Sequence, residues 1–161
     1  MDRSRDELLL VQLIQDMLED LGCKINSHSL ILDFGCGEGR AVYQFKKKGL
    51  NAFGVDIVDS YDTVQKLCKE EGIIKPEEDI FRTIDPANYK IPFDDDTFDF
   101  IVSDQVFEHV QNWPQTLEEI KRVLKPGGSS LHIFPSRYRP IEAHVFVPFA
   151  GIIQNQAYQA F

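Results

Sequence analysis

A short apolar segment that runs directly into a glycine-rich turn constrains this chain more than any other feature. Residues 30–34 (LILDF) are followed by glycines at positions 35, 37 and 39, and a helical pattern begins at Arg40. This order predicts a strand, a tight loop and a helix. Glycines allow the sharp turn and the close approach of a ligand, and the helix N-terminus presents free amides to the same spot. An ordinary strand-to-helix turn needs fewer glycines, so the stretch predicts a cofactor-binding loop.

The charge of the loop narrows the choice of cofactor. Dinucleotide-binding loops have the pattern G-x-G-x-x-G and hold a pyrophosphate at the helix end. Here the pattern is G-x-G-x-G, and two carboxylates, Asp33 and Glu38, lie in or beside the turn. These carboxylates would repel a pyrophosphate. They favour a cofactor that has no phosphate and carries a positive centre.

These residues carry a resemblance to a known family. The segment Leu32-Asp33-Phe34-Gly35-Cys36-Gly37-Glu38-Gly39 resembles motif I of the class I S-adenosylmethionine (SAM) dependent methyltransferases, and the chain is similar to the small-molecule, type 11 group. The resemblance implies SAM as cofactor and S-adenosylhomocysteine as product. It also implies that Asp33, Gly35, Cys36 and Gly37 contact the cofactor, at its methionine end.

The second predicted strand ends in an acid that suits a ribose. The segment 51–56 (NAFGVD) places Asp56 17 residues beyond Gly39. A carboxylate at this place can accept hydrogen bonds from both ribose hydroxyls, although an exposed turn acid is the alternative. The resemblance implies the same role for Asp56 and packing of Ile57 on the adenine.

A third predicted strand, 79–85, also ends in an acid, Asp85. In the family an acid near this place accepts a hydrogen bond from the adenine amino group, and a turn like Ile91-Pro92-Phe93 follows. Asp85 lies one residue farther from this turn than is usual in the family. The resemblance therefore implies that Asp85 contacts the adenine, with Asn88 as a competing residue.

Residues 93–110 are the second informative block. Residues 100–102 predict a buried strand, and Ser103, Asp104 and Gln105 follow it at the carboxyl edge of the sheet, where ligands bind in open α/β folds. We expect these three residues beside the cofactor. The acidic run 94–96 is typical of a solvated turn, and no set of converging oxygens indicates a metal site. His109, next to Glu108, is either a catalytic base or half of a structural pair.

The later segments complete an α/β pattern. Trp113 opens a helix that ends at 126–128, and a fifth strand is expected at 130–135; the segment 124–128 (LKPGG) again resembles the family. Strands and helices alternate, which predicts a mainly parallel sheet with helices on both faces and right-handed crossovers. The resemblance implies a Rossmann-like class I methyltransferase fold, apparently without the last two strands of the usual seven.

We expect one domain with three segments. These are an N-terminal helical segment, 1–27, whose helix at 5–21 covers the core or the cofactor cleft; a SAM-binding α/β core, 28–136; and a short or truncated tail, 137–161. An uncovered fifth strand would be a hazard for aggregation. We therefore expect a homodimer formed through the tail or through the exposed sheet edge.

Composition excludes several partners. The chain has 161 residues, of which 43% are hydrophobic, enough for one core, and a formal net charge of −9. Nucleic acids and anionic membranes need clustered basic residues, so neither is expected as a partner. The three cysteines show no disulfide or zinc spacing, no apolar run reaches the roughly 18 residues of a membrane span, and the start is unlike a signal peptide. We expect a cytoplasmic protein.

The function that these observations favour is transfer of a methyl group from SAM to O, N or C of a small-molecule acceptor by SN2 displacement. His144 in the tail and His109 are the candidate bases. Two other enzyme classes, an NAD-linked dehydrogenase and an aminopropyl transferase, fit the loop and the motifs less well. The principal alternative is a non-catalytic or truncated SAM-binding protein.

Overall fold

The computed structural model describes residues 3–134 of the chain. The predicted tail 137–161, with His144 and the expected dimer contact of the tail, lies outside the described residues. The elements in chain order are α1 (Arg3–Asp20), β1 (Leu30–Phe34), α2 (Arg40–Lys47), β2 (Asn51–Asp56), α3 (Asp62–Glu70), β3 (Phe81–Thr83), β4 (Phe98–Asp104), the 3₁₀ helix η1 (Phe107–His109), α4 (Trp113–Val123) and β5 (Leu124–Ile133).

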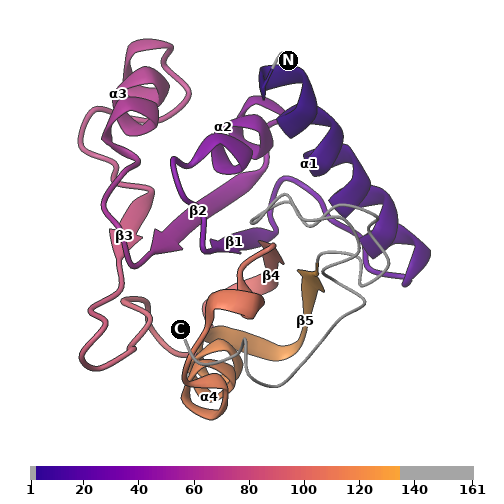
Figure 1. Ribbon diagram of the computed structural model, residues 1–161. Helices are drawn as coiled ribbons and strands as arrows, with labels where there is room; N and C mark the ends of the chain where they lie inside the picture. The colour runs from indigo at the N-terminus through magenta and orange to yellow at the C-terminus, as the bar shows by residue number, and fades with distance from the viewer. Residues whose placement is uncertain (1–2, 135–161) are drawn as a thin grey trace, which may run out of the picture.

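The strands form one parallel sheet in the order β3-β2-β1-β4-β5 (Figure 1). From β1 the chain moves outward through β2 and β3, then returns to place β4 on the other side of β1. The strand order therefore reverses between β1 and β4. In open α/β sheets, ligands bind outside the carboxyl ends of the strands at such a point.

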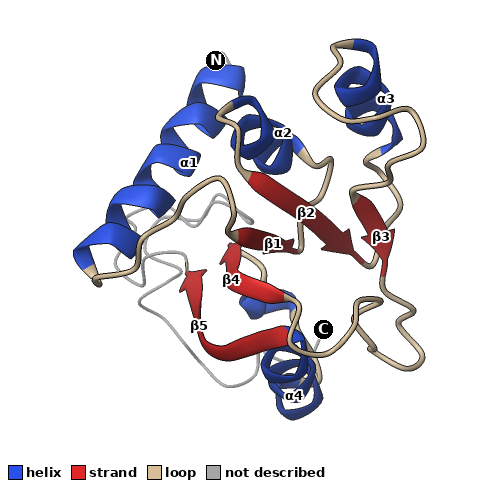
Figure 2. Ribbon diagram, turned by 180° about the vertical axis from the view of Figure 1, so that it is seen from behind, coloured by secondary structure: helices blue, strands red, loops and turns tan. Residues whose placement is uncertain are grey.

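Helices cover both faces of the sheet, which confirms the predicted fold class. Helices α1, α2 and α3 lie on one face, and α4 and η1 lie on the other (Figures 1 and 2). Successive side chains of β1 point to opposite faces of the sheet and contribute to both core layers. Ile31 belongs to the cluster under α1 to α3, and Leu32 to the cluster under α4. Both side chains are fully buried, as expected for a parallel sheet that is covered twice.

Helix α1 covers the sheet as part of the core. Val11, Ile14 and Leu18 are buried in one cluster with Val42 and Phe45 of α2. These positions recur at helical spacing, so burial of this face anchors α1 beside α2. None of the helices within residues 3–134 is both long and apolar enough to cross a membrane.

Two strands differ in extent from the prediction. Strand β5 begins at Leu124 rather than near position 130, because Leu124 already pairs with Phe98 before an irregularity, after which Phe100 pairs with Ser129. Strand β3 covers only Phe81–Thr83, pairing with the end of β2. The glycine-rich segment 126–128 therefore lies inside β5, where it forms the irregular part of the strand.

Candidate functional site

The loop between β1 and α2 depends on glycine at defined places. Gly35, Gly37 and Gly39 have φ angles of 78°, 53° and 82°, in the left-handed region that favours glycine. A Cβ atom on Gly35 would lie 2.4 Å from a methyl carbon of Val106, and one on Gly39 would lie 2.4 Å from the ring of Phe81. The loop can therefore lie this close to its neighbours only without side chains at 35 and 39.

Asp56 holds this loop from the neighbouring strand. Its Oδ2 atom accepts a hydrogen bond from the Gly37 N–H at 2.8 Å, and its Oδ1 atom accepts one from the Val58 N–H at 3.0 Å. The backbone also connects this loop to β2, because the N–H groups of Gly35 and Cys36 both donate to the carbonyl of Val55. An ionised carboxylate has about four acceptor positions, so Asp56 retains capacity for a bound hydroxyl.

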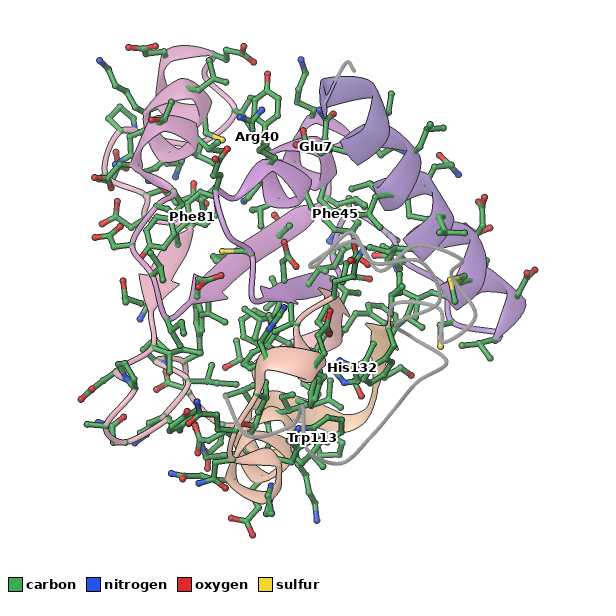
Figure 3. All side chains as sticks on the ribbon, viewed as in Figure 1. Glu7, Arg40, Phe45, Phe81, Trp113 and His132 are labelled. Atoms are coloured by element: carbon green, nitrogen blue, oxygen red, sulfur yellow. The ribbon has the colours of Figure 1, made fainter. Side chains whose placement is uncertain are left out.

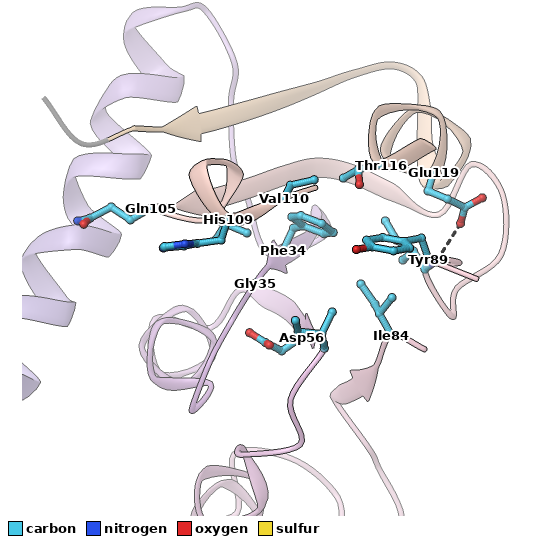
Figure 4. Close-up of a pocket in the computed structure, with 13 residues that line it drawn as sticks. Phe34, Gly35, Asp56, Ile84, Tyr89, Gln105, His109, Val110, Thr116 and Glu119 are labelled. Atoms are coloured by element: carbon cyan, nitrogen blue, oxygen red, sulfur yellow. Dashed lines mark hydrogen bonds between the residues drawn. The ribbon is translucent and has the colours of Figure 1, made fainter. Parts of the chain in front are cut away.

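A mainly apolar pocket of about 250 Å³ opens beside Asp56 (Figure 4). This volume is close to the lower end of the roughly 300–1,000 Å³ typical of small-molecule sites. The predicted site residues that line it are Gly35, Asp56, Ile57, Gln105 and His109. The other lining residues were not predicted from the sequence: Phe34, Ile84, Tyr89, Ile91, Val106, Val110, Thr116 and Glu119. We call this cavity the Asp56 pocket.

A second, acidic pocket of about 310 Å³ lies under α1. The predicted residues Asp33, Gly35, Cys36 and Asp104 line it, together with Glu38, Arg40 and Ala41 and, from α1, Glu7, Leu10 and Ile14. We call it the Asp33 pocket. Gly35 lines both cavities, so the glycine loop borders both pockets.

Charge is concentrated in the Asp33 pocket. Asp33 is buried, and its burial together with the charges of Asp104 and Asp56 raises the pKa of the Asp33 carboxyl to about 7. Burial, Asp33 and Asp56 likewise raise the pKa of the Cys36 thiol far above its ordinary value. A cation placed here would relieve the repulsion between the carboxylates. The pocket therefore suits a positively charged ligand and disfavours a phosphate.

Arg40 joins the loop to α1 at the rim of the Asp33 pocket. Its Nε atom donates to Glu38 at 2.7 Å and lies 3.6 Å from the Glu7 carboxylate (Figure 3). The guanidinium group thereby connects the first helix with the segment that carries the glycines. This link was not predicted, because no sequence pattern relates Glu7 to Arg40.

Gly37 of the glycine loop lines neither pocket, and two further predicted residues also line neither of them. The Asp85 carboxylate accepts hydrogen bonds from the Ala87 N–H at 2.9 Å and from the Asn88 side chain at 3.2 Å, within its own turn. The Asp85 carbonyl accepts the Tyr89 N–H at 2.9 Å. Asp85 therefore shapes the turn that carries Tyr89 into the Asp56 pocket, where Tyr89 has a positive φ of 53°.

Ser103 is the second of these residues. It is buried, and its Oγ atom lies 2.8 Å from Nδ1 of His132 on β5. Alternation along β4 explains the separation, because neighbouring side chains leave a strand on opposite faces. Asp104 thus faces the Asp33 pocket under α1, and Ser103 faces the other layer. There the His132 ring packs against Phe107 with centroids 4.4 Å apart.

His109 lies at the outer rim of the Asp56 pocket. Its side chain is 63% exposed, and its Nε2 atom lies 4.0 Å from the Glu108 carboxylate. The acidic turn 94–96 has structural contacts instead, since Asp95 accepts a hydrogen bond from Arg122 at 2.7 Å. Among the residues that the structure describes, no three His, Cys, Asp or Glu side chains converge as metal ligands would.

Fold and site together define a class of protein. The sheet order, the glycine loop at the reversal of strand order, the acid at the end of β2 and the acidic pocket under α1 are those of a class I methyltransferase. A family model described as a methyltransferase domain matches residues 32–131, and the chain belongs to that family. SAM is the cofactor of this family, and the acidic Asp33 pocket fits its positive charge.

Known proteins agree with this assignment. An uncharacterized methyltransferase of Schizosaccharomyces pombe is 36% identical over 102 residues, which cover 61% of this chain and 37% of that protein. The sarcosine/dimethylglycine N-methyltransferase of Halorhodospira halochloris is 26% identical over 122 residues, covering 74% and 42%. The crystal structure of a SAM dependent methyltransferase from Aquifex aeolicus superposes with a TM-score of 0.68 at 21% identity, covering 93% of this chain and 75% of that one. The chain spans less than half the length of these two curated relatives.

Proposed function

We propose that the protein transfers the methyl group of SAM to an O, N or C atom of a small-molecule acceptor. The observation that carries this proposal is the pair of pockets that both have Gly35 in their walls, one acidic and one mainly apolar. SAM has a methionine end with two positive charges and one carboxylate, and an adenosine end with a flat adenine ring; these ends match the acidic and the apolar pocket. When bound, SAM supplies an electrophilic methyl group for an in-line SN2 displacement.

The Asp33 pocket is proposed to hold the methionine end. Asp33 and Asp104 attract its positive charges, and the backbone at Gly35, Cys36 and Gly37 allows a close approach. Leu10 and Ile14 of helix α1 form an apolar part of the wall of this pocket, from which water is excluded. Exclusion of water favours a reaction in which charge becomes dispersed.

The Asp56 pocket is proposed to hold the adenosine end. The free acceptor positions of Asp56 suit the ribose hydroxyls, and Ile57 and the other apolar walls suit the base. Gln105 lines the same pocket at the end of β4. For Asp85 and Ser103 we propose positioning roles, because Asp85 fixes the turn of Tyr89 and Ser103 contacts His132.

His109 is the candidate base within the described residues. Its exposed imidazole at the rim can reach an acceptor that enters from solvent, and a hydroxyl acceptor needs a base. His144 remains a second candidate. An amine acceptor that enters uncharged needs no base before the displacement, so His109 matters most for a hydroxyl.

A small acceptor is supported by charge and by one relative. The net charge of −9 disfavours anionic macromolecules. The relative from Halorhodospira acts, by its name, on sarcosine and dimethylglycine, which are small amines. The alternative function is SAM binding without transfer, which the same pair of pockets would also support.

Calorimetric titration with SAM and S-adenosylhomocysteine, with NADH as control ligand, tests cofactor binding. We expect micromolar binding of both sulfur compounds and none of NADH. Release of S-adenosylhomocysteine is then measured with small amines and small hydroxyl compounds as acceptors. Binding with turnover supports the proposal, binding without turnover on either acceptor class supports the alternative, and absence of binding contradicts both.

We also propose a homodimer through an exposed sheet edge. Among residues 3–134, strand β5 is the last strand on one side of the sheet, and Phe134, directly after it, is half exposed. An uncovered edge offers unpaired backbone groups to a second chain. Light scattering of the full chain should give the mass of a dimer, and a monomer at high concentration would contradict this assembly.

A further inference from the structure

Thr116, whose buried hydroxyl has no partner, is one of the residues that line the Asp56 pocket. Thr116, in the first turns of α4, is 2% exposed, and its Oγ1 atom has no hydrogen-bond partner. Among the described side chains, this is the only buried nitrogen or oxygen atom left unpaired. Buried polar groups in native proteins almost always have partners, so the exception needs an explanation.

The surrounding protein does not supply the partner. The acid about one turn further along the helix, Glu119, already accepts hydrogen bonds from the Ile91 N–H and from two nitrogens of Arg122, at 2.6 to 2.8 Å. A threonine in a helix often donates to the carbonyl four residues earlier. Here the Asn112 carbonyl accepts the backbone N–H of Thr116 at 3.0 Å, and the hydroxyl does not join it.

The position of Thr116 points to a ligand. Figure 4 shows its side chain together with Tyr89 and Glu119 at the end of the pocket away from Gln105 and His109. The walls between are apolar, formed by Phe34, Ile84 and others. A flat ring with apolar faces and a polar edge fits such a space, because its edge would meet the hydroxyl.

We propose that the Thr116 hydroxyl is a specificity-determining contact for the purine ring of the bound cofactor, whose polar edge supplies the missing hydrogen bond. The proposal rests on the proposed function and deepens it. A hydroxyl both donates and accepts, so it can pair with the amino group or with a ring nitrogen. It takes the place that the family resemblance implied for Asp85, which lines neither pocket.

Thr116→Val tests this directly, because valine keeps the shape and loses the hydroxyl. Removal of an unpaired buried hydroxyl should raise the melting temperature of the free protein by a few degrees. Loss of one hydrogen bond to the ligand should weaken S-adenosylhomocysteine binding about tenfold. The two effects have opposite signs, which a merely structural hydroxyl would not produce. Thr116→Ser should retain most of the affinity, and Thr116→Ala gives a second deletion of the hydroxyl.

Thr97→Val is the matched control. The Thr97 hydroxyl donates to the Asp94 carbonyl at 2.7 Å, away from both pockets. Its loss should lower the melting temperature and leave S-adenosylhomocysteine binding unchanged. Thr116→Val and Thr97→Val should therefore change stability in opposite directions.

Ligand analogues identify the contacted atom. The wild type and Thr116→Val are titrated with S-adenosylhomocysteine and with its 6-deamino, 1-deaza, 3-deaza and 7-deaza forms. We expect one analogue to bind the wild type about tenfold more weakly than S-adenosylhomocysteine does. The affinity of this analogue for Thr116→Val should equal its affinity for the wild type. Unchanged binding of S-adenosylhomocysteine to Thr116→Val, as a buried water on the hydroxyl would give, overturns the inference, and so does an equal loss for every analogue. Absence of binding to the wild type instead refutes the proposed function, and this inference with it.

Discussion

The Asp56 carboxylate lies 2.8 Å from the amide nitrogen of Gly37 and accepts its hydrogen bond. This contact joins the end of β2 to the middle of the glycine loop. Because the same carboxylate lines the Asp56 pocket, the group proposed to bind the ribose also fixes the backbone proposed to bind the methionine end. The two halves of the site are thus coupled through one side chain.

Replacement of Asp56 should therefore affect more than the ribose. We expect Asp56→Ala to weaken S-adenosylhomocysteine binding at least tenfold, because hydrogen bonds to a charged group contribute about 1.5–3 kcal/mol each. Calorimetric titration measures the loss. Asp59→Ala, which removes an exposed acid nearby, should bind normally. Equal affinities of Asp56→Ala and the wild type would contradict the assigned role.

Gly35→Ala should abolish binding of S-adenosylhomocysteine through a steric clash, in addition to backbone strain. Gly35 and Gly22 have nearly equal φ angles of 78° and 80°, but an added Cβ meets Val106 at 2.4 Å at position 35 and nothing within 4 Å at position 22. Both variants should lose about 1 kcal/mol of unfolding free energy from the positive φ. Only Gly35→Ala should displace Val106 from the pocket wall. Titration and thermal unfolding of both variants separate the two effects, and normal binding by Gly35→Ala would refute the close approach.

Stability should depend on pH through Asp33. Its pKa is raised from 3.8 to about 7 by burial and by Asp104 and Asp56, so the folded protein favours the neutral acid. The unfolded chain binds fewer protons between these values, and stability from this group is therefore lost as the pH rises from about 4 to about 7. Asp33→Asn removes the effect. The melting temperature of this variant minus that of the wild type should increase across this range and level off above it; a constant difference would be evidence against the raised pKa.

Ser103→Ala should lower stability and leave cofactor affinity unchanged. The mutation removes the hydroxyl 2.8 Å from His132 Nδ1 and leaves a half-buried nitrogen without its partner. The expected loss is about 1–2 kcal/mol of unfolding free energy, measured by denaturant titration. Ser130→Ala, at an exposed position of β5, is the control and should be neutral. A clear loss of S-adenosylhomocysteine affinity in Ser103→Ala would restore Ser103 to the binding site.

The fold was predictable because its signals are local. Apolar runs, glycines and helical spacing each lie within a few residues, and they place β1, β2 and the glycine loop correctly. The prediction was weaker where contacts join distant segments. Thr116 shows the difference. Its helical spacing with the buried residues Ile120 and Val123 indicates, from the sequence, a polar residue that faces inward. The presence of Tyr89 at the same end of the Asp56 pocket, by contrast, goes with a positive φ at Tyr89 that no pattern in the sequence indicates.

The alternation of side chains along a strand also limits how many neighbouring residues can contact one ligand, and this limit could be read from the sequence. Consecutive residues at the end of β4 cannot all face one ligand, because they leave the sheet on opposite sides. Asp104 therefore reaches the Asp33 pocket, whereas Ser103 contacts His132. The extent of β5 was harder to predict from the sequence, because its irregular segment resembles the end of a helix followed by a loop.

The packing of Cys36 against Gly54 has a chemical consequence. The thiol occupies the space that a side chain at position 54 would fill, and its surroundings oppose formation of the thiolate. Only the thiolate attacks disulfides and alkylating agents. The Cys36 sulfur in the glycine loop is therefore held as the neutral thiol, which is the less reactive form toward oxidants and disulfides.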